Sequence, residues 1–248
     1  MKKIVLCADD YGQNNVVSQA IVELIEKKHL SATSCITTEA DFPQHAKQLR
    51  PFIDQIDLGL HFNLTEGEKF QGLGKLMISA FLKRLNKQDI ERELKSQLHQ
   101  FEACFGRLPD YIDGHQHIHQ LPQIREVIVE NWQAPMYIRS TDNPRVWGDW
   151  KKPSYLKRLI IQASGAKALK NLLEQRGIPH NTNFEGVRSF QAKTSFRHSF
   201  LQFLETIESG GIIMCHPGLK SEYDYFSSDE FNADCDSKKI KLVRFRGL

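Results

Sequence analysis

Side chains that could bind a metal ion or transfer a proton follow several of the short apolar runs in the sequence. They are Asp9, Asp10, His61, His115, His117, His119 and His216. Carboxylates and imidazoles are common ligands of divalent metals, and both can act as general acids or bases. If the apolar runs are parallel strands of an α/β fold, their carboxyl ends meet at one face, where active sites of such folds are assembled. The pattern predicts a metal-dependent active site.

The adjacent carboxylates Asp9 and Asp10 suit two different roles in hydrolysis. One can bind the cation while its neighbour accepts a proton from water that the cation activates. The same pair could instead cap a helix or stabilise a turn, because aspartates are frequent at both places. Its position directly after an apolar run favours the chemical role.

The segment 113–119 places Asp113 before three imidazoles, His115, His117 and His119. This density can provide both a metal ligand and the carboxylate that orients it. The pattern itself does not choose among the three histidines. His61, at the end of an alternating run, could equally be a hydrogen-bonded core residue.

His216 lies in the sequence Cys215-His216-Pro217-Gly218, where the Pro-Gly pair predicts an abrupt turn after an apolar strand. Imidazole has an unperturbed pKa near neutrality, so this residue could deliver a proton to an amine leaving group. Alternatively, His216 could be a residue of the turn without a chemical function.

The elements that would position these residues alternate along the chain. Period-two and apolar runs predict strands over 3–8, 32–37, 56–62, 111–115, 136–139, 186–190 and 211–215, and helical periodicity predicts helices over 17–25, 42–49 and 90–105. Segments 63–77, 143–155 and 175–185 have no clear period and are expected to be loops that shape a pocket. Strands alternating with helices predict an α/β protein with parallel strands, here a TIM-like β/α barrel of seven or eight strands with some irregularity. We expect one barrel domain over residues 1–248.

Composition excludes several classes of protein. The chain of 248 residues has a formal net charge of +3 without a long basic stripe, so we expect no nucleic-acid partner. The apolar run Ile4–Ala8 ends at two aspartates and is too short for the core of a signal peptide, which predicts no membrane partner. Five cysteines without a CxxC pair suggest a reducing compartment, and a cytoplasmic location is expected.

Four blocks of the sequence together resemble the YdjC-like carbohydrate deacetylases. The blocks are Ala8-Asp9-Asp10-Tyr11-Gly12, Gly59-Leu60-His61-Phe62-Asn63-Leu64-Thr65, Asp113-Gly114-His115-Gln116-His117-Ile118-His119 and His216-Pro217-Gly218. The resemblance implies a β/α-barrel hydrolase that removes acetyl groups from small N-acetylated saccharides and that could form a homodimer. It implies one divalent metal bound by Asp10, His61 and His115, with Asp9 as base and His216 as acid. The choice of His115 comes from the resemblance alone.

The metal and the substrate contacts are less defined by the sequence. One carboxylate with two imidazoles suits Zn²⁺, Mn²⁺, Co²⁺ or Fe²⁺, and open water-filled positions also accommodate Mg²⁺. Candidate substrate-binding residues are Tyr11, Asn63, His117 and Arg139. Tyr11 stands where the family commonly has phenylalanine and could add a hydroxyl near the site. Arg139 could orient an anionic substrate group or Asp9, or it could pair with a surface carboxylate. Residues 219–248 do not match the terminal helix usual in the family.

Three other functions fit parts of this pattern. Two histidines and one carboxylate also occur in non-haem iron oxygenases, but the second aspartate and the fourth site histidine favour hydrolysis. A metallophosphoesterase would usually need a two-metal clamp and more carboxylates than the sequence places. A sugar- or metal-binding protein without turnover would keep the barrel, yet every proposed catalytic position is filled.

Overall fold

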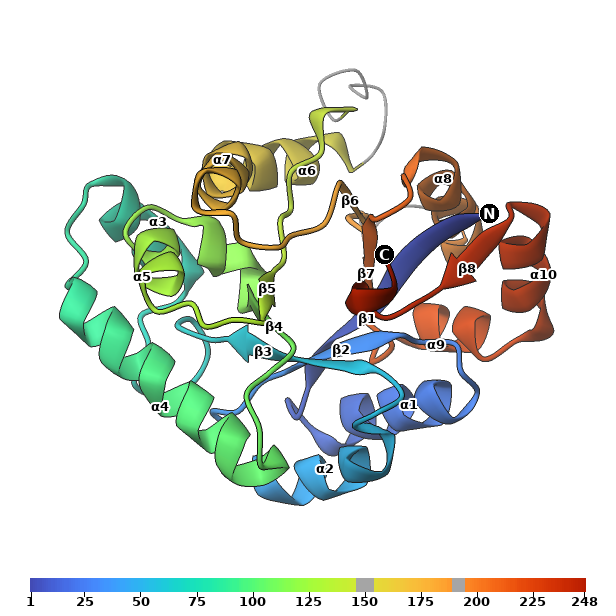
Figure 1. Cartoon of the computed structure of the whole chain (residues 1–248), viewed down its shortest axis with the longest axis horizontal. Coiled ribbons are helices and arrows are strands. Elements are labelled where there is room, and N and C mark those ends of the chain that lie inside the picture. Colours follow the sequence, from blue (N-terminus) through green and yellow to red (C-terminus); the bar gives the residue numbers. More distant parts are fainter. Residues whose placement is uncertain (146–153, 189–194) are drawn as a thin grey trace.

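Eight parallel strands form one sheet that curves into an incomplete barrel in the computed structural model, which describes residues 1–145, 154–188 and 195–248 (Figure 1). The strands are β1 (Lys2–Tyr11), β2 (Ala32–Cys35), β3 (Asp57–Phe62), β4 (Tyr111–Gly114), β5 (Tyr137–Ile138), β6 (Phe184–Glu185), β7 (Ile212–Cys215) and β8 (Ile240–Leu242). Their order is β5-β4-β3-β2-β1-β7-β6, and β8 pairs with β1. The predicted barrel-like α/β fold is confirmed.

The barrel is incomplete because β5 and β6 do not form a ladder with each other among the described residues. The gap is bridged by other hydrogen bonds. The Ile138 amide donates to the Pro179 carbonyl at 3.0 Å, and the Ser140 amide donates to the Asn181 side chain at 2.8 Å. Side-chain and loop contacts therefore hold this side of the barrel in place of strand pairing.

Helices surround the outer face of the sheet (Figure 1). They are α1 (Asn15–Glu26), α2 (Phe42–Leu49), α3 (Leu73–Phe81), α4 (Lys87–Phe105), α5 (Ile124–Glu130), α6 (Tyr155–Ile161), α7 (Lys167–Arg176), α8 (Phe196–Thr206), α9 (Lys220–Phe226) and α10 (Asp229–Ser237), with the short elements η1 (Arg50–Phe52), η2 (His115–Gln120), η4 (Gln162–Ala166) and η5 (Phe245–Gly247). Helix α4 illustrates why they form. It buries Ile90, Leu94 and Phe101 on one face and ends at Gly106, whose φ of 70° is readily adopted by glycine. Among the described residues, no helix is both long and apolar enough to cross a membrane.

Strand β1 pairs with β2, β7 and β8 and carries the aspartate pair. Residues Ile4 to Ala8 are buried, and the strand continues through Asp9 and Asp10 instead of ending before them. Its pairing register with β2 shifts between Ala8 and Tyr11, and Asp10 has a φ of 71°. Because this irregularity changes the direction of the backbone, the strand end turns both carboxylates toward the same pocket.

Gly59 on β3 allows the side chain of Tyr111 on the neighbouring strand to lie across it. The two residues are register partners, and a Cβ atom at position 59 would lie 2.2 Å from the tyrosine ring. We expect Gly59→Ala to lower the free energy of unfolding by about 1–3 kcal/mol, because the ring must shift within a packed core. Denaturant unfolding measures this. Gly74→Ala is the control, since nothing lies within 4 Å of the added Cβ atom; an equal loss in both variants would contradict the packing argument.

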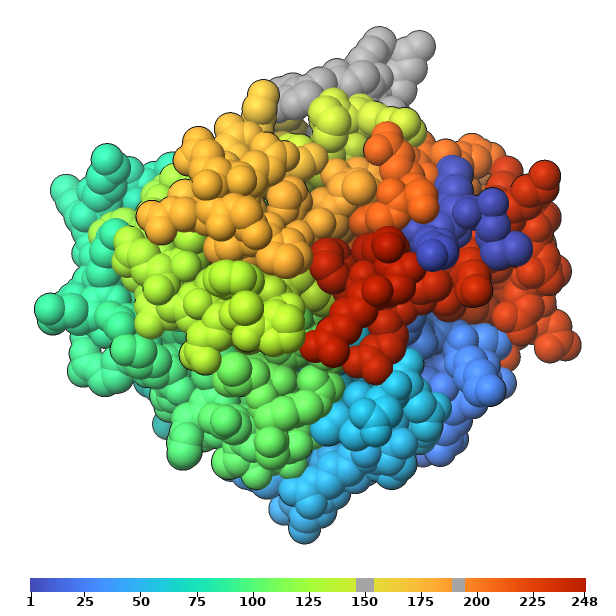
Figure 2. Space-filling model, in the orientation of Figure 1, coloured from blue at the N-terminus to red at the C-terminus, as the bar shows by residue number. Residues whose placement is uncertain are grey.

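The C-terminal segment covers the amino ends of the strands. Strand β8 pairs with the start of β1, and Phe245 stacks on Tyr137 with ring centroids 3.7 Å apart. The Arg244 guanidinium donates to Asp57 at 2.8 Å. Figure 2 shows this segment, in red, across the middle of that face of the molecule. Residues 219–248 thus contain two α-helices and a strand. The end of this segment covers the barrel where the strands begin.

Several predicted elements differ from the structure. The strand predicted over 186–190 is wrong, because the strand is β6 and residues 186–188 follow it, while 189–190 lie outside the described residues. Helix α3 begins inside the predicted loop 63–77, and α7 extends into the predicted loop 175–185. Most of the predicted loop 143–155 lies outside the described residues.

Candidate active site

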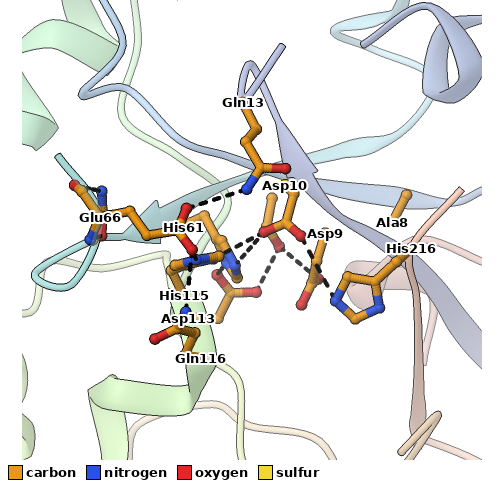
Figure 3. A network of polar contacts seen from close by, with 12 residues as sticks. Ala8, Asp9, Asp10, Gln13, His61, Glu66, Asp113, His115, Gln116 and His216 are labelled. Carbon is orange, nitrogen blue, oxygen red and sulfur yellow. Dashed lines mark hydrogen bonds and ion pairs between the residues drawn. The ribbon is translucent and has the colours of Figure 1, made fainter. Parts of the chain in front are cut away.

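The predicted chemical groups meet in one pocket at the carboxyl ends of β1, β3, β4 and β7 (Figure 3). The pocket has a volume of about 1040 Å³. Its walls include all five residues that were expected to bind metal or transfer protons: Asp9, Asp10, His61, His115 and His216. The parallel strands therefore assemble the site as the spacing of these residues predicted.

Three of these side chains converge on one point. Asp10 Oδ1 lies 3.3 Å from His61 Nε2 and 2.9 Å from His115 Nδ1. Ligand atoms of the three residues all lie within 4.8 Å of one another. One carboxylate and two imidazoles in this arrangement form a donor set that suits a divalent metal and leaves room for water or substrate.

The surroundings of His61 fit a cation at this point. Its Nδ1 donates to Asp113 Oδ1 at 2.6 Å, which leaves Nε2, the nitrogen that faces Asp10, as the atom that could bind a metal ion. Burial lowers the pKa of His61, but the carboxylates of Asp113, Asp9 and Asp10 raise it to about 10. The same negative surroundings that favour a proton on this ring favour a bound metal ion. A carboxylate behind a metal-binding histidine is the usual means of fixing the ring.

His115 is held by a turn and by the loop after β3. The residues that follow it, Gln116 and His117, have φ values of 55° and 61° within η2, so the chain reverses sharply there. Glu66 Oε1 lies 2.9 Å from His115 Nε2, which is buried and makes no regular hydrogen bond. The Glu66 carboxylate also accepts from Gln116 and Gln13, at 3.1 and 3.2 Å (Figure 3). Glu66 was not among the predicted site residues, because a single acidic residue in a polar loop does not distinguish a site residue from an ordinary surface residue.

Asp9 belongs to a buried ionic network behind the cluster of Asp10, His61 and His115. The Arg139 guanidinium donates to both carboxylate oxygens of Asp9, at 2.6 and 2.8 Å, and lies 2.8 Å from Asp113 Oδ2. Burial raises the pKa of Asp9, but the opposite effect of Arg139, His61 and His216 is larger. The net pKa lies well below its usual range, so the carboxyl stays ionised. Ser34 on β2 also donates to Asp113, at 2.5 Å. Cys7, Asp9 and Asp113 could together bind a second metal ion, but Arg139 already provides the positive charge between the two carboxylates.

His216 reaches the pocket from the turn after β7. Its Nε2 lies 3.8 Å from Asp10 Oδ2, and 28% of its side chain is exposed. Its backbone amide donates to Glu222 Oε2 at 2.6 Å, and the other oxygen of this buried carboxylate accepts from Arg188 at 3.0 Å. The backbone of His216 is thus fixed while its ring stays accessible to a bound molecule.

The other two histidines of the segment differ from His115. His119 is fully buried and donates from Nε2 to the Arg139 carbonyl at 2.9 Å, and burial and Arg139 lower its pKa to about 4. His119 therefore supports the backbone of Arg139 as a neutral ring. His117 lines the pocket, and burial and Arg139 hold its pKa well below the usual range. A neutral His117 can contact a polar substrate group.

Three of the predicted substrate-binding residues do not line the pocket. The Tyr11 hydroxyl donates to the His45 carbonyl at 2.6 Å, away from the site. The Asn63 side chain is engaged by structural hydrogen bonds, since it accepts from the amides of Thr65 and Glu66 and donates to the Thr38 hydroxyl. Arg139 is fully buried against Asp9. The structure thus places the side chains of Tyr11, Asn63 and Arg139 outside the pocket lining, and it pairs Arg139 with Asp9, the contact expected if Arg139 orients that carboxylate.

Comparisons with known proteins identify the family and similar folds. The YdjC-like protein family profile matches residues 3–241. A Yersinia enterocolitica protein named chitooligosaccharide deacetylase is 27% identical over 237 residues, covering 88% of this chain and 82% of that protein. A structure from Enterococcus faecalis V583, of a protein named for cellobiose-phosphate cleavage, superposes with a TM-score of 0.74 at 19% identity, covering 99% and 98% of the two chains. A family 4 acetyl xylan esterase from Clostridium thermocellum, solved with a cobalt ion, shares the fold with a TM-score of 0.57 at 10% identity, covering 99% and 89%. The chain belongs to the YdjC-like protein family.

Proposed function

We propose that this protein is a metal-dependent hydrolase that removes the acetyl group from N-acetylated amino sugars. The observation that carries the proposal is the convergence of Asp10, His61 and His115 in one pocket with Asp9 and His216. A metal-binding triad beside a separate base and acid is the set of groups that amide hydrolysis requires. The relatives named chitooligosaccharide deacetylase support the same substrate class.

Each side chain has a defined part in this reaction. Asp10, His61 and His115 would hold the metal, which when bound lowers the pKa of water and polarises the acetamide carbonyl. Asp9 accepts a proton as the water oxygen adds to the carbonyl carbon, and Arg139 keeps this carboxylate ionised and oriented. His216 donates a proton to the nitrogen as the carbon–nitrogen bond breaks. The products are acetate and a free amine.

The geometry disfavours the alternative function of a two-metal phosphoesterase. A two-metal phosphoesterase needs a second cation close to the first. In this site the second group of metal-capable residues surrounds Arg139, whose guanidinium pairs with both Asp9 and Asp113. A single metal centre is therefore the arrangement that the charges favour, and hydrolysis of an amide remains the better fit.

Asp9→Asn tests the assignment of the base. We expect the variant to bind metal as the wild type does, because Asp10, His61 and His115 are retained, while kcat for deacetylation falls about 10²–10⁴-fold. Metal analysis of the purified protein and acetate release measure the two properties. Asp89→Asn, at an exposed carboxylate on α4, is the matched control and should retain full activity. Wild-type turnover by Asp9→Asn with the metal bound would show that the base is another group.

His216→Gln tests the assignment of the acid by the choice of leaving group. An amine must be protonated as it leaves, whereas p-nitrophenolate leaves without a proton. We expect the variant to lose about 10²-fold or more in kcat on an N-acetylated sugar but much less on p-nitrophenyl acetate. Equal losses on both substrates would assign His216 a role in binding or positioning instead.

A further inference from the structure

The pocket extends beyond the catalytic groups along an aliphatic wall. Its volume of about 1040 Å³ is at the upper end of the range of small-molecule sites, roughly 300–1,000 Å³. The wall is formed by Leu73 and Met77 from α3, Leu156, Ile160 and Ile161 from α6, and Leu219 after β7. Helix α3 contacts η2, which begins at His115, and η2 also contacts η4, which continues α6. The aliphatic wall is therefore continuous with the proposed metal-binding group.

The chemical character of this wall is unusual for a site that binds only sugar rings. None of the described residues that line the pocket is Phe, Tyr or Trp. Flat aromatic rings are the side chains that pack best against the apolar face of a sugar, whereas branched and flexible aliphatic side chains pack well against hydrocarbon. The cations Lys157 and Arg188 also line the pocket, but Arg188 pairs with the buried carboxylate of Glu222. The aliphatic residues of the wall therefore favour hydrocarbon over a second sugar ring.

Two wall residues are exposed to solvent although they are large and apolar. Leu156 is 66% exposed and Ile160 is 51% exposed. They are four residues apart and so lie on one face of α6. Exposed apolar surface that continues into a binding pocket commonly marks a ligand contact, because a ligand can remove it from water.

We propose that this wall binds an aliphatic group carried by the acetylated sugar, so that the substrate is an amphiphilic N-acetylated glycoside such as a glycolipid. This inference rests on the proposed deacetylase function and specifies its substrate class. Each methylene buried against the wall strengthens binding about fourfold. An octyl group that is half buried would therefore improve binding about 100-fold over a methyl group.

Acetate release from methyl and octyl N-acetyl-β-D-glucosaminide tests the proposal with the full chain and its metal, at concentrations below micelle formation. The expected kcat/KM is about 100-fold higher for the octyl glycoside, mainly through KM. In Leu156→Ser and Ile160→Ser this preference falls several-fold. Ile78→Ser removes an apolar side chain of α3 that is 63% exposed but does not line the pocket, so the preference and the activity should be unchanged.

Binding of the deacetylated methyl and octyl glucosaminides, measured by calorimetry, separates this inference from the function on which it rests. Tighter binding of the octyl compound, without acetate release from any acetylated glycoside, would support the aliphatic site and contradict the deacetylase function. Equal binding and equal kcat/KM for the two alkyl glycosides would overturn the aliphatic site. A higher kcat/KM for an N-acetylated trisaccharide than for the octyl glycoside would also overturn it, because the wall would then serve sugar rings.

Discussion

Asp10→Ala is expected to abolish stoichiometric metal binding and to reduce acetate release by about 10³-fold or more. Asp10 supplies the carboxylate that both imidazoles face, with its Oδ1 atom 3.3 Å from His61 Nε2 and 2.9 Å from His115 Nδ1. Without it the two rings lose the negative charge that balances a cation. A catalytic metal contributes several kcal/mol of transition-state stabilisation, and each 1.4 kcal/mol corresponds to about tenfold in rate.

Asp113→Asn is the matched comparison for this variant. Asp113 does not belong to the proposed metal-binding triad but accepts a hydrogen bond from His61 Nδ1 at 2.6 Å. Loss of such a supporting carboxylate usually lowers metal affinity about 10–100-fold without removing a ligand. Metal content after gel filtration and acetate release at saturating metal measure both variants. Full metal occupancy and near-normal turnover in Asp10→Ala would contradict the assignment of the triad.

Arg139→Met is expected to lower the free energy of unfolding by about 3–5 kcal/mol. The guanidinium is fully buried and pairs with Asp9 and Asp113, which are both buried. Methionine has a side chain of similar length but leaves two carboxylates without a counter-charge, and removal of one partner from a buried ionic network is strongly destabilising.

Arg145→Met is the control for this stability change, because Arg145 and Glu208 form an exposed pair that should contribute about 1 kcal/mol or less. Urea unfolding, with the slope of the transition checked for both variants, measures the difference. If Arg139→Met were no less stable than Arg145→Met, the buried network would not have the structural role assigned to it. The variant should also lose activity, since Asp9 would no longer be held ionised.

Much of the fold followed from periodicity in the sequence. Helix α2 has the bounds that were predicted, and α4 follows the spacing of Ile90, Leu94 and Phe101. Strand β8 was missed because it has only three residues, of which Ile240 alone is buried, and it lies in a basic segment. Strand β6 was misplaced because it includes Glu185, a charged residue whose buried carboxylate is stabilised by Arg158, Asn143 and Thr206 from other parts of the chain. Such tertiary pairing cannot be recognised from local pattern.

The candidate site was predicted more completely for the residues at strand ends than for those that support them. Asp10, His61 and His216 were expected to meet because parallel strands place their carboxyl ends at one face. All three line the pocket. The directions of individual side chains depend on details that the spacing does not contain. Tyr11 directly follows the aspartate pair, yet its hydroxyl points to His45. The contacts of Glu66 depend on the fold of its loop.

If one bound metal enables the removal of acetyl groups from N-acetylated sugars, acetate release must depend on that ion, and metal-stripped protein provides the assay. The substrates are N-acetylated mono- and disaccharides and alkyl glycosides, assayed before and after addition of Mg²⁺, Zn²⁺, Mn²⁺ or Co²⁺. We expect no release without metal and full recovery at one equivalent of a suitable ion in the wild type but not in Asp10→Ala. Unchanged release by the metal-stripped protein, or no release with any ion despite one tightly bound equivalent, would show that this protein is not a metal-dependent deacetylase of these sugars.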